Sequence, residues 1–507
     1  MSAGDTPGIF QHLRALVGIE RAFVATERAQ STPISRRVDP QTRALAGERG
    51  SDVSTPAVVI AAPASGSGKT TVATGLMGAL RRAGHRVAPF KVGPDFIDPG
   101  YHALATGLPG RNLDPVLVGE PLIGPLFQHG TLGADIAVVE GVMGLFDGRI
   151  SAQAVGQAQG STAHVAGLLG APVVLVVDAR GQSHSVAALL HGFATFDHSV
   201  RIAGVILNRV GTPRHEQVLR QACEQTGVPV LGAIPRDDEL SIPSRHLGLV
   251  TAVEHGRLAQ EAVAAMTELV ARHVDLAALV DAADSRVADA AWNPAVAEHA
   301  ADEVVVALAA GKAFSFGYPE HTELLRAAGA VVVEFDPLTE SLPPHTAALV
   351  LPGGFPEQFT AELSANDVAR QQVRQLAASG APIHAECAGL TYLVDDLDGI
   401  PMCGVLSGSA RFTERLTLGY RDAVATADSS VHVAGTRIVG HEFHRTAVTF
   451  GHDYEPAWRF GRGPSDVVAD GAVHAGVHAG YLHAHAAAHP SAATRFVAAA
   501  AASKLAQ

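Results

Sequence analysis

The chain has 507 residues, more than one hydrophobic core can organise, so at least two domains are expected. It is 47% hydrophobic and 17% charged, with no apolar run long enough to cross a bilayer, which is typical of a soluble globular protein. A net charge of −13 argues against nucleic-acid binding. Three widely spaced cysteines and the absence of a secretory signal favour a cytoplasmic protein without disulfides.

Residues 1–55 form an N-terminal extension of mixed, largely polar composition. An amphipathic helix is indicated around residues 9–26, and the tract after it, rich in Arg, Ser and Pro, is typical of a flexible linker. We therefore expect this extension to be variable or disordered, and its pattern assigns it no function.

From residue 57 onward, short apolar runs alternate with helical stretches. Buried strands joined by helices are typical of a doubly wound parallel sheet. Residues 251–300 are rich in Ala and helical in pattern, which predicts a connector, and the alternation restarts at residue 303. We therefore expect two tandem α/β domains, at 56–250 and 301–500. The strand-like runs are AVVIAA, DIAVVEG, APVVLVVDA, IAGVILN and VPVLGAIP in the first, and EVVVALAA, AVVVEFDPL, AALVLPGG and APIHAE in the second.

The first apolar run leads into a phosphate-binding loop, in AAPASGSGKTTVATG. Its glycines let backbone N–H groups wrap a phosphate at the start of a helix, Lys69 reaches the β- and γ-phosphates, and the Thr70 hydroxyl joins a Mg²⁺ shell. Pro63 replaces the first glycine of the usual pattern. Ala64 replaces the extra lysine of ATPases that position plasmids or division sites, which disfavours that class. The predicted ATP-binding residues are Gly66, Ser67, Gly68, Lys69, Thr70, Thr71 and Asn208.

Asn208 is a candidate for the adenine edge, although Asn at a strand end is often a turn former. Glu140 ends a buried strand at the edge where open α/β sheets bind ligands, so we predict that it holds Mg²⁺. Asp95 and Asp98 lie in FKVGPDFIDPGYHA. Asp95 is assigned to metal or substrate and Asp98 to substrate, with turn formation as the alternative for both.

Cys387 falls between the strand-like APIHAE and the helical AGLTYLVD. A strand–helix turn exposes a nucleophile, and the following helix N-terminus favours its thiolate. The N–H of Ala388 and those of Gly353 or Gly354, in LPGGFPEQF, are candidate oxyanion donors. The other two cysteines, Cys223 and Cys403, lack such a turn and are interpreted as packing residues.

A thiol nucleophile needs a base, and the C-terminal region is rich in histidine. One histidine serving the cysteine is preferred to a metal cluster, because no carboxylate or cysteine joins the group. The segment GHEFHRT, at 440–446, either reaches the same pocket, binds substrate or is structural. The C-terminal candidates are His474, His478, His483, His485 and His489.

Nine ordered segments together resemble the cobyrinic and hydrogenobyrinic acid a,c-diamide synthases, which are glutamine-dependent enzymes of corrin biosynthesis. The resemblance runs from about residue 57 to about residue 500. The segments are AAPASGSGKTT, FKVGPDFIDPGYHALATG, NLD, VEGVMGLFDG, AFSFGYPEHTELLRAAGA, LPGGFPEQFTAELSAN, AECAGLTYL, GHEFHRT and GYLHAH.

The resemblance implies a synthetase domain similar to dethiobiotin synthetase, followed by a flavodoxin-like class I glutamine amidotransferase domain. It implies ATP as co-substrate, Mg²⁺, a homodimer, and amidation of the a and c acetates of hydrogenobyrinate or cobyrinate in cobalamin biosynthesis. The family nucleophile matches Cys387 and its base matches His483, with His485 as second choice. Other class I enzymes follow the base with Pro-Glu, so what orients His483 is open. Glu386 either tunes the thiol or binds the amino group of glutamine.

Three alternatives remain. Nickel-sirohydrochlorin a,c-diamide synthase shares most of these segments, whereas cobyric acid synthase amidates other carboxylates and fits KVGPDFIDPGYH and GHEFHRT less well. The third is of another class, a partner-binding P-loop ATPase with a degenerate amidotransferase module. The intact pair of Cys387 and His483 argues against it.

Overall fold

The computed structural model describes residues 54–150, 158–236, 251–301, 303–463 and 466–505. The helix expected around 9–26 and the linker after it lie outside these ranges. Within them, no helix combines the length and apolar character needed to span a bilayer.

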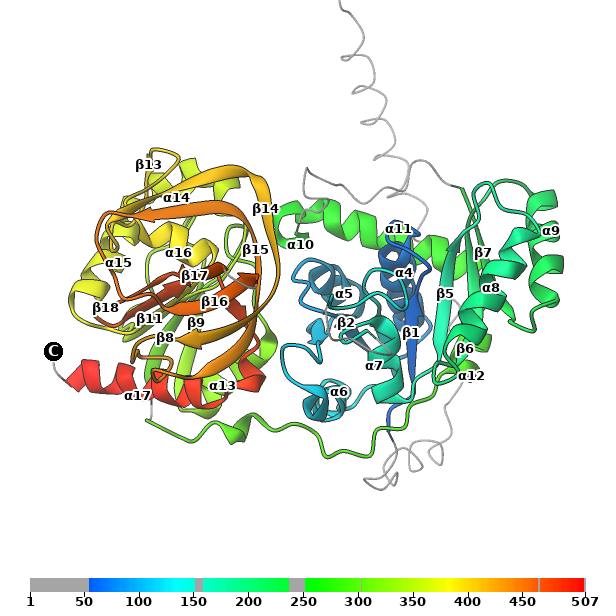
Figure 1. The fold of residues 1–507 in the computed structure, drawn as a ribbon, viewed down its shortest axis with the longest axis horizontal. Helices are drawn as coiled ribbons and strands as arrows, with labels where there is room; N and C mark the ends of the chain where they lie inside the picture. Colours follow the sequence, from blue (N-terminus) through cyan, green and yellow to red (C-terminus); the bar gives the residue numbers. More distant parts are fainter. Residues whose placement is uncertain (1–53, 151–157, 237–250, 302, 464–465, 506–507) are drawn as a thin grey trace, which may run out of the picture. The chain divides into compact units, whose positions relative to one another are not determined.

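The first domain is built on a seven-stranded sheet in which every strand pair is parallel (Figure 1). The strand order is β3-β2-β4-β1-β5-β6-β7. The five apolar runs predicted here are confirmed, whereas β2 and β3 were not recognised as strands. The bounds are β1 Ala57–Ala61, β2 Val87–Val92, β3 Arg111–Leu113, β4 Ile136–Glu140, β5 Val173–Asp178, β6 Ile202–Val210 and β7 Val230–Pro235.

Helices cover both faces of this sheet, as a doubly wound fold requires. Alternate residues of β1 enter two separate cores: Val58 and Ile60 pack with α4, α5 and α11, while Val59 packs with α6 to α9. The bounds are α4 Lys69–Arg82, α5 Asp98–Thr106, η1 Glu120–Leu122, α6 Ile123–Gly130, α7 Thr162–Leu169, α8 Ser185–Phe196, α9 Pro213–Glu224 and α11 Arg257–His273.

The stretch expected to be a helical connector is helical only in its first part. It contains α10 (Ala252–His255), α11 and α12 (Leu276–Ala282), and after these only the short η2 (Pro294–Val296). The buried residues Ala259, Val263, Met266 and Val270 form one stripe of α11, and this stripe packs against α4. The helical part is thus packed onto the first domain, and only the stretch after it links the two domains.

A larger side chain at Gly75 of α4 tests this packing. A Cβ atom there would lie 2.4 Å from the carbonyl oxygen of Met266 and 2.6 Å from Val270 Cγ2. We expect Gly75→Leu to cost about 1–3 kcal/mol of unfolding free energy through overpacking, and to lower the thermal midpoint. Gly167→Ala in α7 is the control, because nothing lies within 4 Å of its added Cβ. An unchanged midpoint for Gly75→Leu would contradict the docking of α11.

The second domain is built on a six-stranded sheet of order β18-β19-β11-β10-β8-β9, parallel except for β18. The four runs predicted here as strands are confirmed as β8 to β11. The bounds are β8 Val304–Ala309, β9 Ala330–Phe335, β10 Ala348–Leu351, β11 Ile383–Glu386, β18 Ala472–His474 and β19 Val477–Gly480.

Helices also cover both faces of this second sheet. In β11, Ile383 and Ala385 pack into the core formed with α14, α15 and α16, whereas His384 and Glu386 face the side covered by α13 and α17. The bounds are α13 Pro319–Ala327, η3 Pro356–Gln358, α14 Thr360–Ala365, α15 Asp367–Ala378, α16 Ala388–Leu393, η4 Ala486–Ala488 and α17 Ser491–Leu505.

A third sheet, which the sequence did not predict, is dominated by the long antiparallel pair β14 and β15. The last strand, β20, pairs with β15, and His441 lies opposite His483. This pairing places GHEFHRT beside GYLHAH. The bounds are β12 Asp396–Leu397, β13 Ile400–Pro401, β14 Gly408–Ala425, β15 Arg437–Phe450, β16 Trp458–Gly463, β17 Asp466–Asp470 and β20 His483–Ala484.

Candidate active sites

The predicted phosphate-binding loop joins β1 to α4. Gly68 adopts a φ of +96°, and a Cβ atom there would lie 2.2 Å from Asn208 Nδ2, so only glycine fits. The Asn208 amide donates to the carbonyl of Ser67 at 2.9 Å, and Lys69 Nζ donates to the carbonyl of Met143 at 2.5 Å. Asn208 therefore braces the loop, and its contact with adenine stays a prediction.

A buried cluster of charged and polar side chains lies at the start of α4. Thr70 Oγ1 donates to Glu140 Oε1 at 2.6 Å, and the other oxygen of this carboxylate lies 2.6 Å from His102 Nε2. Lys91 Nζ lies 3.3 Å from Asp98 Oδ2 and 3.6 Å from Glu140 Oε1. Lys91 and His102 are not among the residues predicted from the sequence. The available signals were a lysine inside a buried strand and a histidine one helical turn after Asp98.

Charge pairing sets the protonation of this cluster. Burial alone would raise the pKa of Glu140, but Lys91, His102 and Thr70 outweigh it and lower the pKa to about 2. Burial, together with Asp95 and Glu140, raises the pKa of Asp98 well above its ordinary value. The buried Lys91 ammonium stays charged, because these carboxylates raise its pKa against the effect of burial.

The two aspartates of FKVGPDFIDPGYHA differ in their surroundings. Asp95 Oδ1 accepts hydrogen bonds from the N–H groups of Ile97, at 2.7 Å, and Asp98, at 3.0 Å, so Asp95 shapes the turn. Asp98 is buried beside Thr70 and Glu140, and its Oδ1 has no hydrogen-bond partner among the described residues. The structure therefore brings Asp98, rather than Asp95, to the predicted metal ligands.

Cys387 lies at the expected turn between β11 and α16. Its φ of 49° and ψ of −97° are rare for a residue with a side chain, and such strain is typical of a nucleophile held at a turn. Only glycine fits two residues later, because a Cβ at Gly389 would lie 2.3 Å from the carbonyl oxygen of Leu351. The thiol lies 3.8 Å from the carbonyl oxygen of Phe443 on β15.

The expected stabilisation of a resting thiolate is not found. Burial raises the pKa of the Cys387 thiol, and hydrogen bonds from the backbone N–H groups of Ala388 and Gly354 only partly oppose it. The following helix has only six residues, and the charged groups that act on the thiol, Glu357 and Glu386, are acidic and raise its pKa further. The thiol is therefore protonated at rest and needs a base. The same two N–H groups were predicted as oxyanion donors.

A cleft opens beside Cys387, lined also by Gly354, Glu357, His444 and Arg445. Arg445 Nε is buried without a hydrogen-bond partner within the described part of the chain, which suits it to a carboxylate ligand. The sequence analysis missed Glu357 and Arg445 as residues lining this cleft, although each lies within a segment that it singled out.

Two histidines are candidates for the base: His444 lines this cleft, and His483 lies against Gly353, which directly precedes the cleft residue Gly354. Both ring nitrogens of His444 have hydrogen-bond partners. Nδ1 lies 2.8 Å from the carbonyl oxygen of Thr446, and Nε2 lies 3.3 Å from Glu442 Oε1. His483 places Nδ1 3.1 Å from the carbonyl oxygen of His441, while its Nε2 has no partner among the described residues. A backbone carbonyl thus takes the place of the missing acid, and the unpartnered Nε2 favours His483 as the base.

His483 is fully buried, and burial lowers its pKa to about 4, so the imidazole is neutral near pH 7. A Cβ atom at Gly353 would lie 2.3 Å from its Nε2, and the next residue, Gly354, directs its N–H toward Cys387. His485 lies elsewhere, with its ring centroid 4.2 Å from that of Tyr318 and its Nε2 3.8 Å from Glu320 Oε2.

The remaining candidates have no site of their own. Within the described ranges, no three His, Cys, Asp or Glu side chains are arranged to hold a metal ion, and this includes the C-terminal histidines. Cys223 and Cys403 are fully buried, and burial raises their pKa values to about 11 and about 12. These two thiols are inert packing groups, as predicted.

A phosphate-binding loop on one parallel sheet and a cysteine turn on another define a nucleotide-binding domain joined to a glutamine amidotransferase domain. Family models match accordingly: a CobQ/CobB/MinD/ParA nucleotide binding domain at 58–250 and a CobB/CobQ-like glutamine amidotransferase domain at 305–491. The chain belongs to the family of hydrogenobyrinate and cobyrinate a,c-diamide synthases, which are glutamine-dependent ligases.

Three relatives show the extent of this similarity. Hydrogenobyrinate a,c-diamide synthase of Mycobacterium tuberculosis H37Rv is 71% identical over 444 residues, covering 87% of this chain and 97% of the relative. The enzyme of the same name from Streptomyces coelicolor is 56% identical over 477 residues, with the same two coverages. Cobyrinate a,c-diamide synthase of Gloeobacter violaceus is 42% identical over 449 residues, covering 87% and 96%.

Gly353→Ala tests the assignment of His483. The added Cβ would displace the His483 imidazole from its place against Gly353. We expect glutamine hydrolysis to fall by about 10²-fold, in line with the loss of a positioned general base, while synthesis from free ammonia is retained. His485→Gln is the comparison and should hydrolyse glutamine normally. The assignment is wrong if His485→Gln is the more damaging change.

Proposed function

We propose that the chain converts the a and c acetate groups of a corrin ring to amides, using ATP and glutamine, in cobalamin biosynthesis. The observation that carries the proposal is one chain holding both a phosphate-binding loop with a buried carboxylate cluster and a cysteine turn with a neutral histidine. The relatives of 71% and 56% identity are named for hydrogenobyrinate, which favours the metal-free ring as substrate.

Glutamine is hydrolysed in the cleft at Cys387. His483 Nε2 takes the thiol proton, and the sulfur attacks the carboxamide carbon, while the N–H groups of Gly354 and Ala388 stabilise the oxyanion. The C–N bond then breaks, and the leaving nitrogen takes the proton from His483, so ammonia departs uncharged. Water, deprotonated by His483, attacks the thioester carbon and releases glutamate with the free thiol.

The ring is activated in the first domain. A ring carboxylate attacks the γ-phosphorus of ATP held by Lys69 and the loop N–H groups, and ADP leaves. Ammonia attacks the carbonyl carbon of the acyl phosphate, and phosphate leaves with the formation of the amide. Two ATP and two glutamine serve the two acetates. Lys91 stabilises the negative charge of the buried cluster throughout.

Mg²⁺ fits the first site, because Thr70 and Glu140 offer oxygen ligands and Asp98 has a buried oxygen without a partner. The ion would neutralise phosphate charge there. A homodimer and a cytoplasmic location remain predictions.

Cys387→Ser separates the two half-reactions. We expect glutamine-driven amidation to fall by about 10³-fold or more, because serine is a weaker nucleophile in this site. Synthesis from high ammonia should stay near the parent level. Mass spectrometry of the products, with hydrogenobyrinate and cobyrinate offered in parallel, measures both activities and identifies the ring. A folded variant that ammonia does not rescue would contradict the proposed division of labour.

Glu140→Gln tests the first site. Loss of this carboxylate leaves the buried Lys91 and His102 without their shared partner, so we expect glutamine-driven and ammonia-driven amidation both to fall by about 10²-fold or more. Glutaminase activity, measured as glutamate released, should persist, since Cys387 and His483 are untouched. Retention of ammonia-driven amidation in this variant would show that Glu140 has no part in ring activation.

A further inference from the structure

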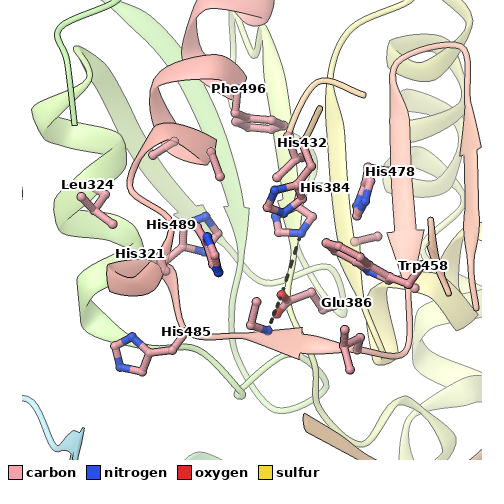
Figure 2. A pocket seen from close by; sticks show the side chains of 18 residues that line it. His321, Leu324, His384, Glu386, His432, Trp458, His478, His485, His489 and Phe496 are labelled. Carbon is pink, nitrogen blue, oxygen red and sulfur yellow. Dashed lines mark hydrogen bonds and ion pairs between the residues drawn. The ribbon is translucent and has the colours of Figure 1, made fainter. Parts of the chain in front are cut away.

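A backbone carbonyl, rather than a carboxylate, accepts the hydrogen bond of the His483 imidazole. Glu386, which precedes the nucleophile, does not line the Cys387 cleft and borders two small cavities on the side of the second sheet covered by α13 and α17. Figure 2 shows its carboxyl between His384, whose Nε2 is 3.8 Å away, and the strand carrying Ala484, whose N–H donates to it at 3.3 Å. This placement argues against binding of the glutamine amino group, one of the two roles considered from the sequence.

One hydrogen bond does not hold the His483 ring completely. The bond from Nδ1 to the carbonyl oxygen of His441, at 3.1 Å, holds one edge of the imidazole. It leaves the ring plane free to turn, because the second side-chain torsion of histidine has a broad energy minimum. Since Nε2 has no hydrogen-bond partner among the described residues, packing against the ring has to set the direction of this atom.

An aromatic cluster packs against the His483 ring. The ring centroid of Phe96 lies 5.3 Å from that of His483, and the centroid of Phe316 lies 6.4 Å from it. Phe96 and Phe316 are themselves stacked, with centroids 5.1 Å apart and planes inclined by 10°. Gly353 approaches the Nε2 edge of the imidazole. One glycine and two phenyl rings therefore limit the rotation of the imidazole.

Phe96 belongs to the first domain, whereas the imidazole belongs to the second. The phenyl ring lies in the turn between β2 and α5, and the Asn112 side chain holds this turn from within the first domain. Asn112 Nδ2 donates to the carbonyl oxygens of Gly93, at 2.8 Å, and Asp95, at 2.7 Å. Because the backbone is held at both of these points, the turn presents the phenyl ring at a defined place beside the base.

We propose that Phe96 is a positioning residue for glutamine hydrolysis, supplied by the synthetase domain to the amidotransferase domain. It acts through His483, because its ring sets the plane in which Nε2 accepts the thiol proton and shields the imidazole from water. This inference rests on the proposed roles of Cys387 and His483. The amidotransferase site is then complete only when the first domain is in contact with the second.

Shielding matters because a base has to be neutral before it can take a proton. His483 is fully buried, and burial is the largest cause of its low pKa, which is about 4. The other groups that act on this pKa lie on β15: the carbonyl of His441 and the carboxylate of Glu442 raise it, and His444 lowers it.

The side of the imidazole that faces Phe96 is apolar. The turn carrying Phe96 also carries Asp95, but the Oδ1 atom of this aspartate accepts hydrogen bonds from N–H groups of its own turn. Tyr318, which packs on Phe96 with centroids 4.9 Å apart, contributes a neutral ring. Removal of the phenyl ring would admit water, so the pKa of His483 should rise toward its ordinary value of about 6.5.

Phe96→Ala in the full chain tests the proposal through glutamine hydrolysis, measured as glutamate released, both without and with ATP and the ring. We expect kcat to fall by about tenfold or more, because the base is misplaced, while KM for glutamine changes by less than about twofold. The acid limb of kcat/KM should move up by about one pH unit or more. Phe96→Leu keeps apolar bulk over the imidazole, so its acid limb should stay near that of the parent.

Two control variants separate this role from general contact between the domains. Asp422→Ala removes another such contact, the ion pair of Asp422 Oδ2 with Arg149 Nη2 at 2.6 Å. Tyr318→Phe keeps the ring that packs on Phe96 and removes only a hydroxyl without a partner among the described residues. Both variants should match the parent in kcat and in pH profile. The retained KM shows that the cleft of Phe96→Ala is folded.

The outcomes separate this inference from the proposed function. An unchanged kcat and acid limb in Phe96→Ala overturn the inference, and so does a rise in KM alone, which would place Phe96 in glutamine binding. An equal loss in Asp422→Ala also overturns it, because the effect would then come from domain contact in general. Failure of the parent enzyme to release glutamate under either condition would instead overturn the proposed function.

Discussion

The amidotransferase site depends on the pairing of β15 with β20. It sets His441 opposite His483, so that a backbone carbonyl orients the imidazole of His483, the residue proposed as the base. The same pairing sets Gly440 opposite Ala484, whose N–H points to Glu386, and β15 continues into the wall of the cleft. The orientation of His483, the contact between Ala484 and Glu386 and one wall of the Cys387 cleft thus all depend on one short strand pair.

The site in the first domain depends instead on a buried cluster of charged and polar side chains. Lys91, Glu140 and His102 are all buried, and the charges of Lys91 and Glu140 are stable there because each compensates the lost hydration of the other. These side chains are shielded from bulk solvent, and an acyl phosphate formed beside them needs protection from water. The two half-reactions therefore differ in their need for water: the acyl phosphate has to be kept from it, whereas the thioester at Cys387 has to be reached by one water molecule.

Local patterns predicted the parts of the molecule that local forces determine. The apolar parallel strands, the loop before Lys69, Glu140 and the turn at Cys387 were all readable, because burial on both faces and turn chemistry leave marks in short segments. The third sheet has no such local pattern, because β14 is largely part-exposed and its buried and exposed residues do not alternate regularly. The roles of Lys91 and of the His441 carbonyl depend on pairings between distant segments. The expected thiolate is not found because burial, followed by the charge of Glu357, raises the pKa of Cys387.

Two carboxyl groups, the buried Asp114 and the part-buried Glu386, differ in how fully the fold satisfies their hydrogen-bonding capacity. Asp114 accepts hydrogen bonds from the Tyr420 hydroxyl and two backbone N–H groups, a satisfied structural position. Glu386 accepts one long bond from Ala484 and faces two cavities. A carboxyl so poorly satisfied costs stability compared with an apolar residue of similar size.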